Sequence, residues 1–274
     1  MRGGVLSSQK KRLARMLLAL DIKNSGIVAG FQEDGTWLAK VRLGVDRSAD
    51  ELGILLAASA ERAGIRVDAE DSSAWISSVV PALTSRAVDA IASTFGLRAS
   101  VVGPGTKTGI KIRTDNPSEL GSDIVCSAVA ARARNSGATV VVDFGSALVL
   151  SALDSAGELL GVAMVPGLET AALALHASTA QIPQVRLDTP KRAIGKNTAQ
   201  SIQSGILFGY AGLVSRLVAM MSEEMAQRVS VIGSGEEAGR AILNQAGFST
   251  FVPDLVLEGI ALIAERSHQI LPLV

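Results

Sequence analysis

The chain has 274 residues, of which 48% are hydrophobic and 19% charged, so it is too apolar to be disordered and long enough for two domains. Its 26 lysines and arginines balance its 26 aspartates and glutamates, which leaves no net charge to hold nucleic acid or an anionic membrane, and we expect neither partner. Cys126 is the only cysteine, which excludes an intramolecular disulfide and a cysteine-rich metal site and favours the cytoplasm.

The first fifteen residues are interpreted as an extension that precedes the folded part. They carry basic residues from Lys10 to Arg15, and the apolar run 16–20 that follows stops at Asp21. This run is too short for a membrane helix or for the apolar part of a secretory signal, and no small-residue cleavage site follows it. We therefore expect residues 1–15 to be a solvated tail, and we predict neither export nor a membrane helix.

Two segments half a chain apart follow the same pattern. In each, an apolar strand ends in an aspartate, Asp21 or Asp143, and a second strand leads on to a glycine turn. The turn glycines, Gly35 and Gly157, lie 14 residues after the aspartate in both segments. Small residues let backbone N–H groups approach an anion, and an aspartate can hold a neutralising cation, so the pattern indicates two hairpins that bind the phosphates of one nucleotide. The alternative is a pair of ordinary hairpins whose aspartates and serines only form turns.

Between and after the hairpins, helices alternate with strands. Ser48 and Glu51 have the capping-box spacing, Pro81 suits a first helical turn, and Asn116 with Glu119 repeats the cap spacing. The expected helices cover residues 48–64, 81–96, 116–134, 168–180, 197–221 and 254–265. The expected strands cover residues 71–80, 101–102 and 229–232, with a turn at 233–235. This alternation is typical of an α/β protein in two halves, which we divide into an N-terminal domain, 16–135, and a C-terminal domain, 136–274.

In this order, the motifs resemble those of the type III pantothenate kinases, enzymes of the acetate-kinase, sugar-kinase and actin-like superfamily. The similarity extends over residues 16–266. It depends on eight short motifs, which are DIKNS (21–25), ISSVVP (76–81), GPGTKTG (103–109), DNPSELGSD (115–123), VDFGSA (142–147), VPGL (165–168), GKNT with QSG (195–205) and PD with LEG (253–259).

The resemblance implies two related actin-like, ribonuclease H-like domains, each a mixed sheet flanked by helices, with ATP in the cleft between them. It implies ATP-dependent phosphorylation of the primary hydroxyl of pantothenate to 4'-phosphopantothenate, which is the first step of coenzyme A biosynthesis. The implied protein is a cytoplasmic homodimer, and the implied cofactors are ATP, Mg²⁺ and a monovalent cation, K⁺ or NH₄⁺.

The resemblance also assigns roles to single residues. Asp123 would be the general base that accepts the hydroxyl proton, and Asp143 would be the ligand of the monovalent cation. The residues implied to hold ATP are Asp21, Ile22, Lys23, Asn24, Ser25, Gly26, Ile27, Val28, Gly145 and Ser146. Those implied for pantothenate are Thr114, Gly121, Ser122, Asp123, Ile124 and, across the dimer interface, Thr198. On position alone, Asp123 can also be a first-turn carboxylate favoured by the helix dipole, and Thr198 only an N-cap.

Several positions depart from the family pattern. Lys23 stands where the family has glycine, Thr114 where it has tyrosine, Ile124 where it has arginine, and Cys126 where it has asparagine. Because one lost hydrogen bond to a charged group costs about 1.5 to 3 kcal/mol, a few such losses are enough to abolish a slow activity. Two functions stay open: an active pantothenate kinase with a rewired site, and a catalytically weakened or repurposed nucleotide-binding or regulatory homologue. The missing arginine adds a third, a kinase for another small hydroxyl substrate.

Overall fold

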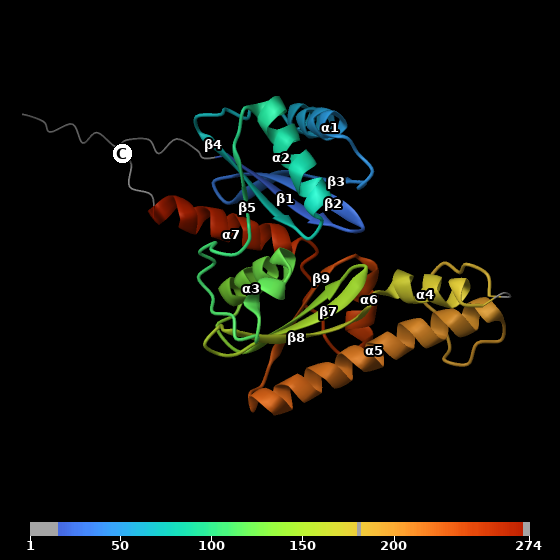
Figure 1. The fold of residues 1–274 in the computed structure, drawn as a ribbon. Helices are drawn as coiled ribbons and strands as arrows, with labels where there is room; N and C mark the ends of the chain where they lie inside the picture. Colours follow the sequence, from blue (N-terminus) through green and yellow to red (C-terminus); the bar gives the residue numbers. More distant parts are fainter. Residues whose placement is uncertain (1–15, 180–181, 271–274) are drawn as a thin grey trace, which may run out of the picture.

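The protein is described by a computed structural model that covers residues 16–179 and 182–270, and the predicted tail 1–15 lies outside the described residues. Two mixed sheets lie one above the other, with helices around and between them (Figure 1). The strand order is β3-β2-β1-β4-β5 in the first sheet and β8-β7-β6-β9 in the second. In both, a central strand pairs with an antiparallel neighbour on one side and a parallel neighbour on the other.

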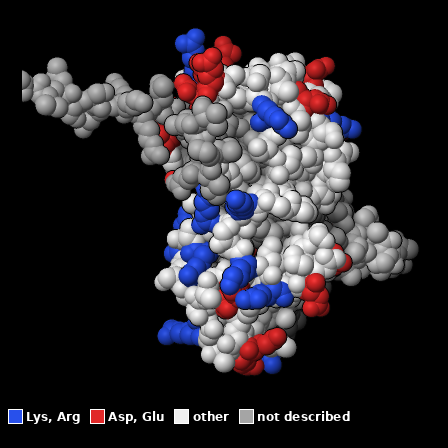
Figure 2. Space-filling view, turned by 60° about the vertical axis from the view of Figure 1, so that its left-hand side comes forward, with Lys and Arg blue, Asp and Glu red and all other residues white. Residues whose placement is uncertain are grey.

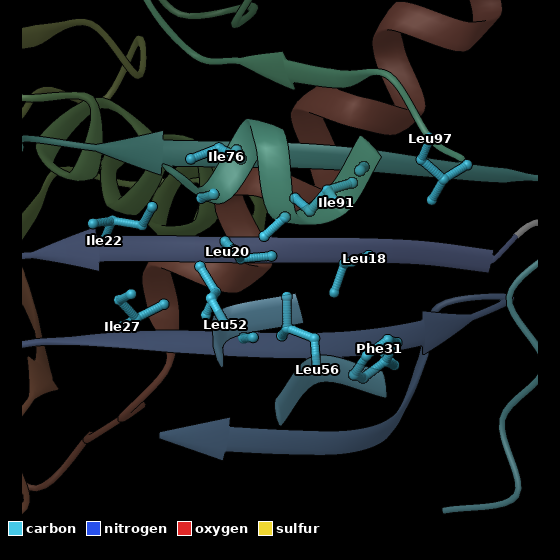
Figure 3. Packing of buried hydrophobic residues seen from close by; sticks show 14 of the residues in the cluster. Leu18, Leu20, Ile22, Ile27, Phe31, Leu52, Leu56, Ile76, Ile91 and Leu97 are labelled. Carbon is cyan, nitrogen blue, oxygen red and sulfur yellow. The ribbon is translucent and has the colours of Figure 1, made fainter. Parts of the chain in front are cut away.

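The first sheet is built from the N-terminal half of the chain. Its strands are β1 (Met16–Lys23), β2 (Gly26–Glu33), β3 (Thr36–Leu43), β4 (Ser72–Ser78) and β5 (Ala99–Val101). Helices α1 (Ala49–Arg62) and α2 (Pro81–Phe95) cover one face, which we call its outer face, and bury leucine, isoleucine and phenylalanine side chains there (Figure 3). Local signals place these helices as predicted, since Ser48 and Glu51 form the capping box and Gly96 ends α2 in the left-handed conformation.

The second sheet comes from the C-terminal half. Its strands are β6 (Thr139–Phe144), β7 (Ala147–Leu153), β8 (Leu159–Pro166) and β9 (Ser230–Gly235). The helices on its outer face are α4 (Leu168–Ala177), α5 (Thr198–Met225) and α6 (Ala238–Gln245). The turns predicted at Gly35 and Gly157 join β2 to β3 and β7 to β8, and both glycines have a φ near +80°, which favours glycine.

The inner faces of the two sheets are covered by α3 (Ser122–Arg134) and α7 (Leu255–Ile270), which pack against each other between the sheets (Figure 1). Helix α7 is the last helix of the chain, yet it packs on the first sheet, with Val256 and Ile260 beside Leu17 of β1. At the contact between the two helices, a Cβ on Gly259 would overlap the carbonyl oxygen of Cys126. The two halves are therefore held together by closely packed helices.

Two expectations about local structure are corrected, and one helix is not predicted at all. Asn116 caps only a 3₁₀ turn, Pro117–Glu119, because the backbone of Leu120 is extended and α3 starts anew at Ser122. Residues 233–235 form the end of β9 rather than a turn, since Gly233 lets Phe251 and Leu243 pack closely on the strand. Helix α6 has no counterpart among the predicted elements.

Helix α5 is long and apolar. Its most apolar stretch of 18 residues has a mean hydropathy of 1.4, which by length and composition alone would suffice to cross a membrane. Core helices of folded proteins pass the same test, and α5 packs one face on the second sheet. Figure 2 shows lysines and arginines together with acidic side chains on one surface of the protein. Among the ion pairs of the described residues, Lys111 and Arg113 both pair with Glu158.

Candidate active site

Asp21 lies on the inner face of the first sheet, at the carboxyl end of its central strand. Side chains alternate along a strand, so Leu18 and Leu20 of β1 enter the outer core while Leu17 and Ala19 enter the inner one. Asp21 continues the inner series and is 6% exposed. The alternation therefore points this carboxylate toward α3 and α7, away from the core of the first sheet.

Asp143 repeats this placement in the second sheet. It follows Val141, which packs in the inner cluster with α3, by two residues along β6. The parallel neighbours correspond as well, because Asp21 is paired with Ser77 of β4 and Asp143 with Ser234 of β9. Both serines are almost fully buried. The two halves thus present the same aspartate and serine pair at the same edge of their sheets.

Lys23 connects the two halves. It is the last residue of β1, on the same face as Asp21, and its Nζ lies 2.6 Å from Oδ2 of Asp143. Burial alone lowers the pKa of the Lys23 ammonium, but Asp143, Asp21 and Asp123 together outweigh burial and raise it, so the lysine carries its charge. Burial raises the pKa of Asp21 to about 7, against the attraction of Lys23. The expected meeting of the two hairpins is present, with a lysine between them.

The first residues of α3 are fixed to the end of β4. The Ser122 hydroxyl accepts a hydrogen bond from the backbone N–H of Ser78 at 2.9 Å and lies 2.9 Å from the hydroxyl of Ser77. At the N-cap, a Cβ on Gly121 would overlap the carboxylate of Asp123, so glycine leaves room for that carboxylate at the helix N-terminus. These contacts hold Asp123 beside the first sheet.

Asp123 belongs to the same group of charges. Burial raises the pKa of its carboxyl, Lys23 lowers it, and Asp143 raises it. Its Oδ1 accepts a hydrogen bond of 2.9 Å from the backbone N–H of Ile124. A half-buried carboxylate with a raised pKa is a better proton acceptor than an exposed one, so the environment suits a general base.

The turn between β6 and β7 brings backbone groups close to Asp143. Gly145 and Ser146 form this turn, and the Ser146 carbonyl accepts a hydrogen bond of 2.9 Å from the backbone N–H of Gly167. A Cβ on Gly167 would overlap the Gly145 carbonyl oxygen, and one on Gly235 would lie 2.6 Å from Oδ1 of Asp143. Gly167 thus lets its backbone pack closely on the turn, and Gly235 lets the backbone of β9 approach this carboxylate.

In the turn between β1 and β2, backbone groups and small side chains are available to a nucleotide. Asn24 and Ser25 are exposed and Gly26 is half-buried. By contrast, the side chains of Ile22 and Ile27 lie in the outer core with α1 and α2 (Figure 3). Of these two residues, only the backbone is available to a nucleotide.

Four other predicted residues are less closely tied to the charges. Val28 packs against the inner cluster, and Ile124 is buried between α3 and the second sheet. The Thr114 hydroxyl is buried and makes no hydrogen bond with the described residues. Thr198 is the exposed first residue of α5, and the cap of that helix is Asn197. Thr198 begins the helix at the end of the second half that lies away from α3 (Figure 1).

Sequence reasoning missed one acidic residue near the site. Glu236 directly follows β9, and its pKa is raised by burial and by Glu169, while Lys23 lowers it and Asp143 raises it. Because β9 is the parallel neighbour of β6, a residue after its carboxyl end must come close to Asp143. Because the sequence predicts a turn at residues 233–235, it gives no indication that Glu236 follows a strand.

The carboxylates are suited to Mg²⁺ that arrives with a nucleotide. Oδ1 of Asp21 and Oδ1 of Asp143 are buried and make no hydrogen bond with the described residues. The described residues contain no cluster of three or more histidine, cysteine, aspartate or glutamate side chains that would hold a metal alone. Mg²⁺ in proteins is commonly held by one or two carboxylates together with substrate phosphates, and Asp21 fits that role.

The chain is similar in sequence to known proteins over most of its length. The family model described as "Type III pantothenate kinase" matches residues 17–220. A type III pantothenate kinase of Dehalococcoides mccartyi is 37% identical over 258 residues, which cover 93% of this chain and 100% of that protein.

Two solved structures share the fold. A putative Baf family transcriptional activator from Campylobacter jejuni has a TM-score of 0.56 at 17% identity, over 92% of this chain and 100% of the other. The activator of the 2-hydroxyisocaproyl-CoA dehydratase from Clostridium difficile, with bound ADPNP, has a TM-score of 0.52 at 14% identity, over 94% and 99%.

Proposed function

This chain belongs to the type III pantothenate kinase family, and from that premise we propose that it transfers the γ-phosphoryl group of ATP to the primary hydroxyl of pantothenate in the cytoplasm. The observation that carries the proposal is the family match over 17–220, which includes the three aspartates whose charges act on one another between the sheets. The fold is that of the actin-like kinases, with two related sheets joined by α3 and α7.

Asp123 supports the proposal as general base. In the proposed step, the pantothenate hydroxyl oxygen attacks the γ-phosphorus, the bond from that phosphorus to the ADP oxygen breaks, and the hydroxyl proton passes to Asp123. Phosphoryl transfer asks the protein mainly to orient the nucleophile and to compensate charge. Asp123 has a raised pKa and is fixed at the start of α3, so it is suited to orient the attacking hydroxyl.

The two turns support binding of the phosphates. Backbone N–H groups around Asn24, Ser25 and Gly145, together with the Ser25 and Ser146 hydroxyls, would contact ATP oxygens. Mg²⁺ at Asp21 would neutralise phosphate charge during transfer. Asp21 would hold this ion through its unpartnered oxygen, and the positive charge would offset the cost of burying the carboxylate.

The resemblance further implies K⁺ or NH₄⁺ at Asp143. One oxygen of that carboxylate is bound by the Lys23 ammonium at 2.6 Å, and the other makes no hydrogen bond with the described residues. A second monovalent cation at Asp143 would stand beside a like charge. The residues present therefore fit this ion poorly, whereas Asp21 makes no ion pair with the described residues.

A homodimer is part of the proposal. Large apolar side chains are exposed along β8 and α4, namely Leu160, Val162, Met164, Leu173 and Leu175. An exposed apolar surface of this kind is typical of a protein–protein contact, and a second copy of the chain would cover it. Thr198, which begins α5, would then reach the pantothenate site of the partner.

The second candidate function is a weakened or repurposed homologue that binds nucleotide without turnover. It is favoured by Ile124 and Cys126, which place buried apolar side chains where the family has an arginine and an asparagine. The site then lacks a cation for the carboxylate of pantothenate at that position. A kinase for a small hydroxyl substrate without a carboxylate follows from the same observation.

ATP turnover by purified protein, with and without pantothenate, separates these functions. We expect ADP to form only with pantothenate, and Asp123→Asn to lower the rate by at least about 10²-fold. Asp89→Asn, on the exposed side of α2, is the matched control and should leave the rate unchanged. Thermal stabilisation by ATP without turnover would instead support the non-catalytic homologue. Turnover with other small alcohols but not with pantothenate would support the third function.

A further inference from the structure

The Lys23 ammonium occupies a fixed position between the two halves. Its Nζ is 2.6 Å from Oδ2 of Asp143, 120 residues away in the chain, and the two side chains are only 19% and 14% exposed. Such a short distance between opposite charges is typical of a strong, charge-assisted hydrogen bond. Because Lys23 ends β1 and Asp143 lies near the end of β6, each partner is held by a sheet.

The surroundings of this ammonium are acidic. Asp143, Asp21 and Asp123 all stabilise its positive charge, and the ammonium in turn lowers the pKa of Glu236. Together these groups come from β1, β6, α3 and the end of β9. A lysine ammonium is a compact point charge with three donors, so in charge it equals one monovalent ion.

The position of the lysine follows from the chain itself. Lys23 directly precedes the turn at Asn24 and Ser25, and alternation along β1 directs it to the same inner face as Asp21. Opposite it, Gly235 has a φ of +89°, and a Cβ there would lie 2.6 Å from Oδ1 of Asp143. The β9 backbone thus packs closely against the Asp143 carboxylate, which helps to hold it in place opposite the Lys23 ammonium.

We propose that the Lys23 ammonium serves as a built-in monovalent cation at Asp143, so that this protein needs neither K⁺ nor NH₄⁺. The inference about turnover rests on the proposed kinase function, whereas the inference about ion binding does not. The ammonium neutralises Asp143 beside the phosphate-binding turns and repels a free cation from the same carboxylate. A cation that other proteins take from solution is here part of the chain.

The first test compares ATP turnover with pantothenate in KCl, NH₄Cl and choline chloride at equal ionic strength. The wild-type rate should change by less than about twofold between the three salts. Lys23→Gly removes the ammonium and opens its space, so its rate in choline chloride should fall by about 10²-fold and recover in KCl or NH₄Cl. Lys23→Met fills the space without charge and should be poorly rescued, while the exposed Lys191→Met should match the wild type.

The second test needs no turnover. Crystals soaked in RbCl should show no anomalous peak beside Asp143 in the wild type and a clear peak in Lys23→Gly. The melting temperature of the wild type should be equal in KCl and choline chloride, whereas that of Lys23→Gly should rise in KCl. A wild-type rate that depends on K⁺, or rubidium beside Asp143 in the wild type, would overturn the proposal. These wild-type measurements decide the matter even where the Lys23 variants fail to fold, and the crystals decide it even where no kinase activity is found.

Discussion

Replacing Asp21 by asparagine should stabilise the fold while it removes a carboxylate from the proposed phosphate site. The side chain is 6% exposed, and Oδ1 makes no hydrogen bond with the described residues. Burial raises its pKa from 3.8 to about 7, with Asp123, Asp143 and Asp254 adding to the rise and Lys23 opposing it. Asparagine has almost the same shape and no charge, so it avoids the cost of burying the carboxylate.

The stabilisation of the fold by Asp21→Asn should grow as the pH rises. Below pH 3.8 the carboxyl is protonated in both the folded and the unfolded chain, so its titration does not change the free energy of unfolding. Between pH 3.8 and about 7 the unfolded chain loses the proton first, and each pH unit costs the wild type about 1.4 kcal/mol of stability. Above pH 7 the cost is constant. Between pH 5 and pH 8, the advantage of Asp21→Asn should therefore grow by about 2 to 3 kcal/mol.

Urea unfolding at pH 5 and pH 8, in EDTA and without nucleotide, measures this difference. The exposed Asp46→Asn serves as control, because its stability should stay within about 0.5 kcal/mol of the wild type at both pH values. Parallel pH profiles for wild type and Asp21→Asn would refute the reasoning, as they would show that Asp21 is not buried in charged form. Added Mg²⁺ and ATP should stabilise the wild type and leave Asp21→Asn nearly unchanged.

Four further substitutions test the packing and the proposed dimer. Gly259→Ala should lower the free energy of unfolding, measured in urea, by about 1 to 3 kcal/mol, because its Cβ would overlap the Cys126 carbonyl oxygen. Gly205→Ala is the control, since a Cβ there meets no atom, and it should raise the free energy of unfolding by up to about 1 kcal/mol. Ser122→Ala should cost about 1 to 3 kcal/mol by the same measurement, since it leaves a backbone N–H of β4 without its partner. Met164→Glu, on strand β8 where large apolar side chains are exposed, should convert the proposed dimer to a monomer in sedimentation velocity. A wild-type monomer would contradict the proposed dimer.

Local signals in the sequence were sufficient for much of the fold. The capping box at Ser48 and Glu51, the first-turn proline at Pro81 and the final glycine at Gly96 each act within one helical turn, and their helices lie where predicted. The matched spacing of the two hairpins likewise predicted that Asp21 and Asp143 occupy equivalent strand ends. Such features depend on neighbours along the chain, so a single sequence contains the information.

The features that were missed depend on contacts between distant segments. Gly233 was interpreted as a turn residue, but its missing Cβ serves the packing of Phe251 on the strand. The helix predicted from Asn116 is broken before Ser122, whose hydroxyl is held by β4, 44 residues earlier in the chain. The ion pair of Lys23 with Asp143 spans 120 residues, and a lysine after a strand gives no sign of its partner.

The departures from the family pattern change where the site carries its positive charge. The cation missing at Ile124 is replaced by an apolar side chain buried between α3 and the second sheet, so that position cannot attract a substrate carboxylate. The cation gained at Lys23 is held 2.6 Å from Asp143, beside the phosphate turns, and while paired there it cannot serve that carboxylate either. On the inference above, the Lys23 ammonium stands in for the implied monovalent ion at Asp143, so it does not make up for the cation missing at Ile124. For the proposed kinase, we therefore expect ATP binding to be retained and selection for a carboxylate on the second substrate to be weaker.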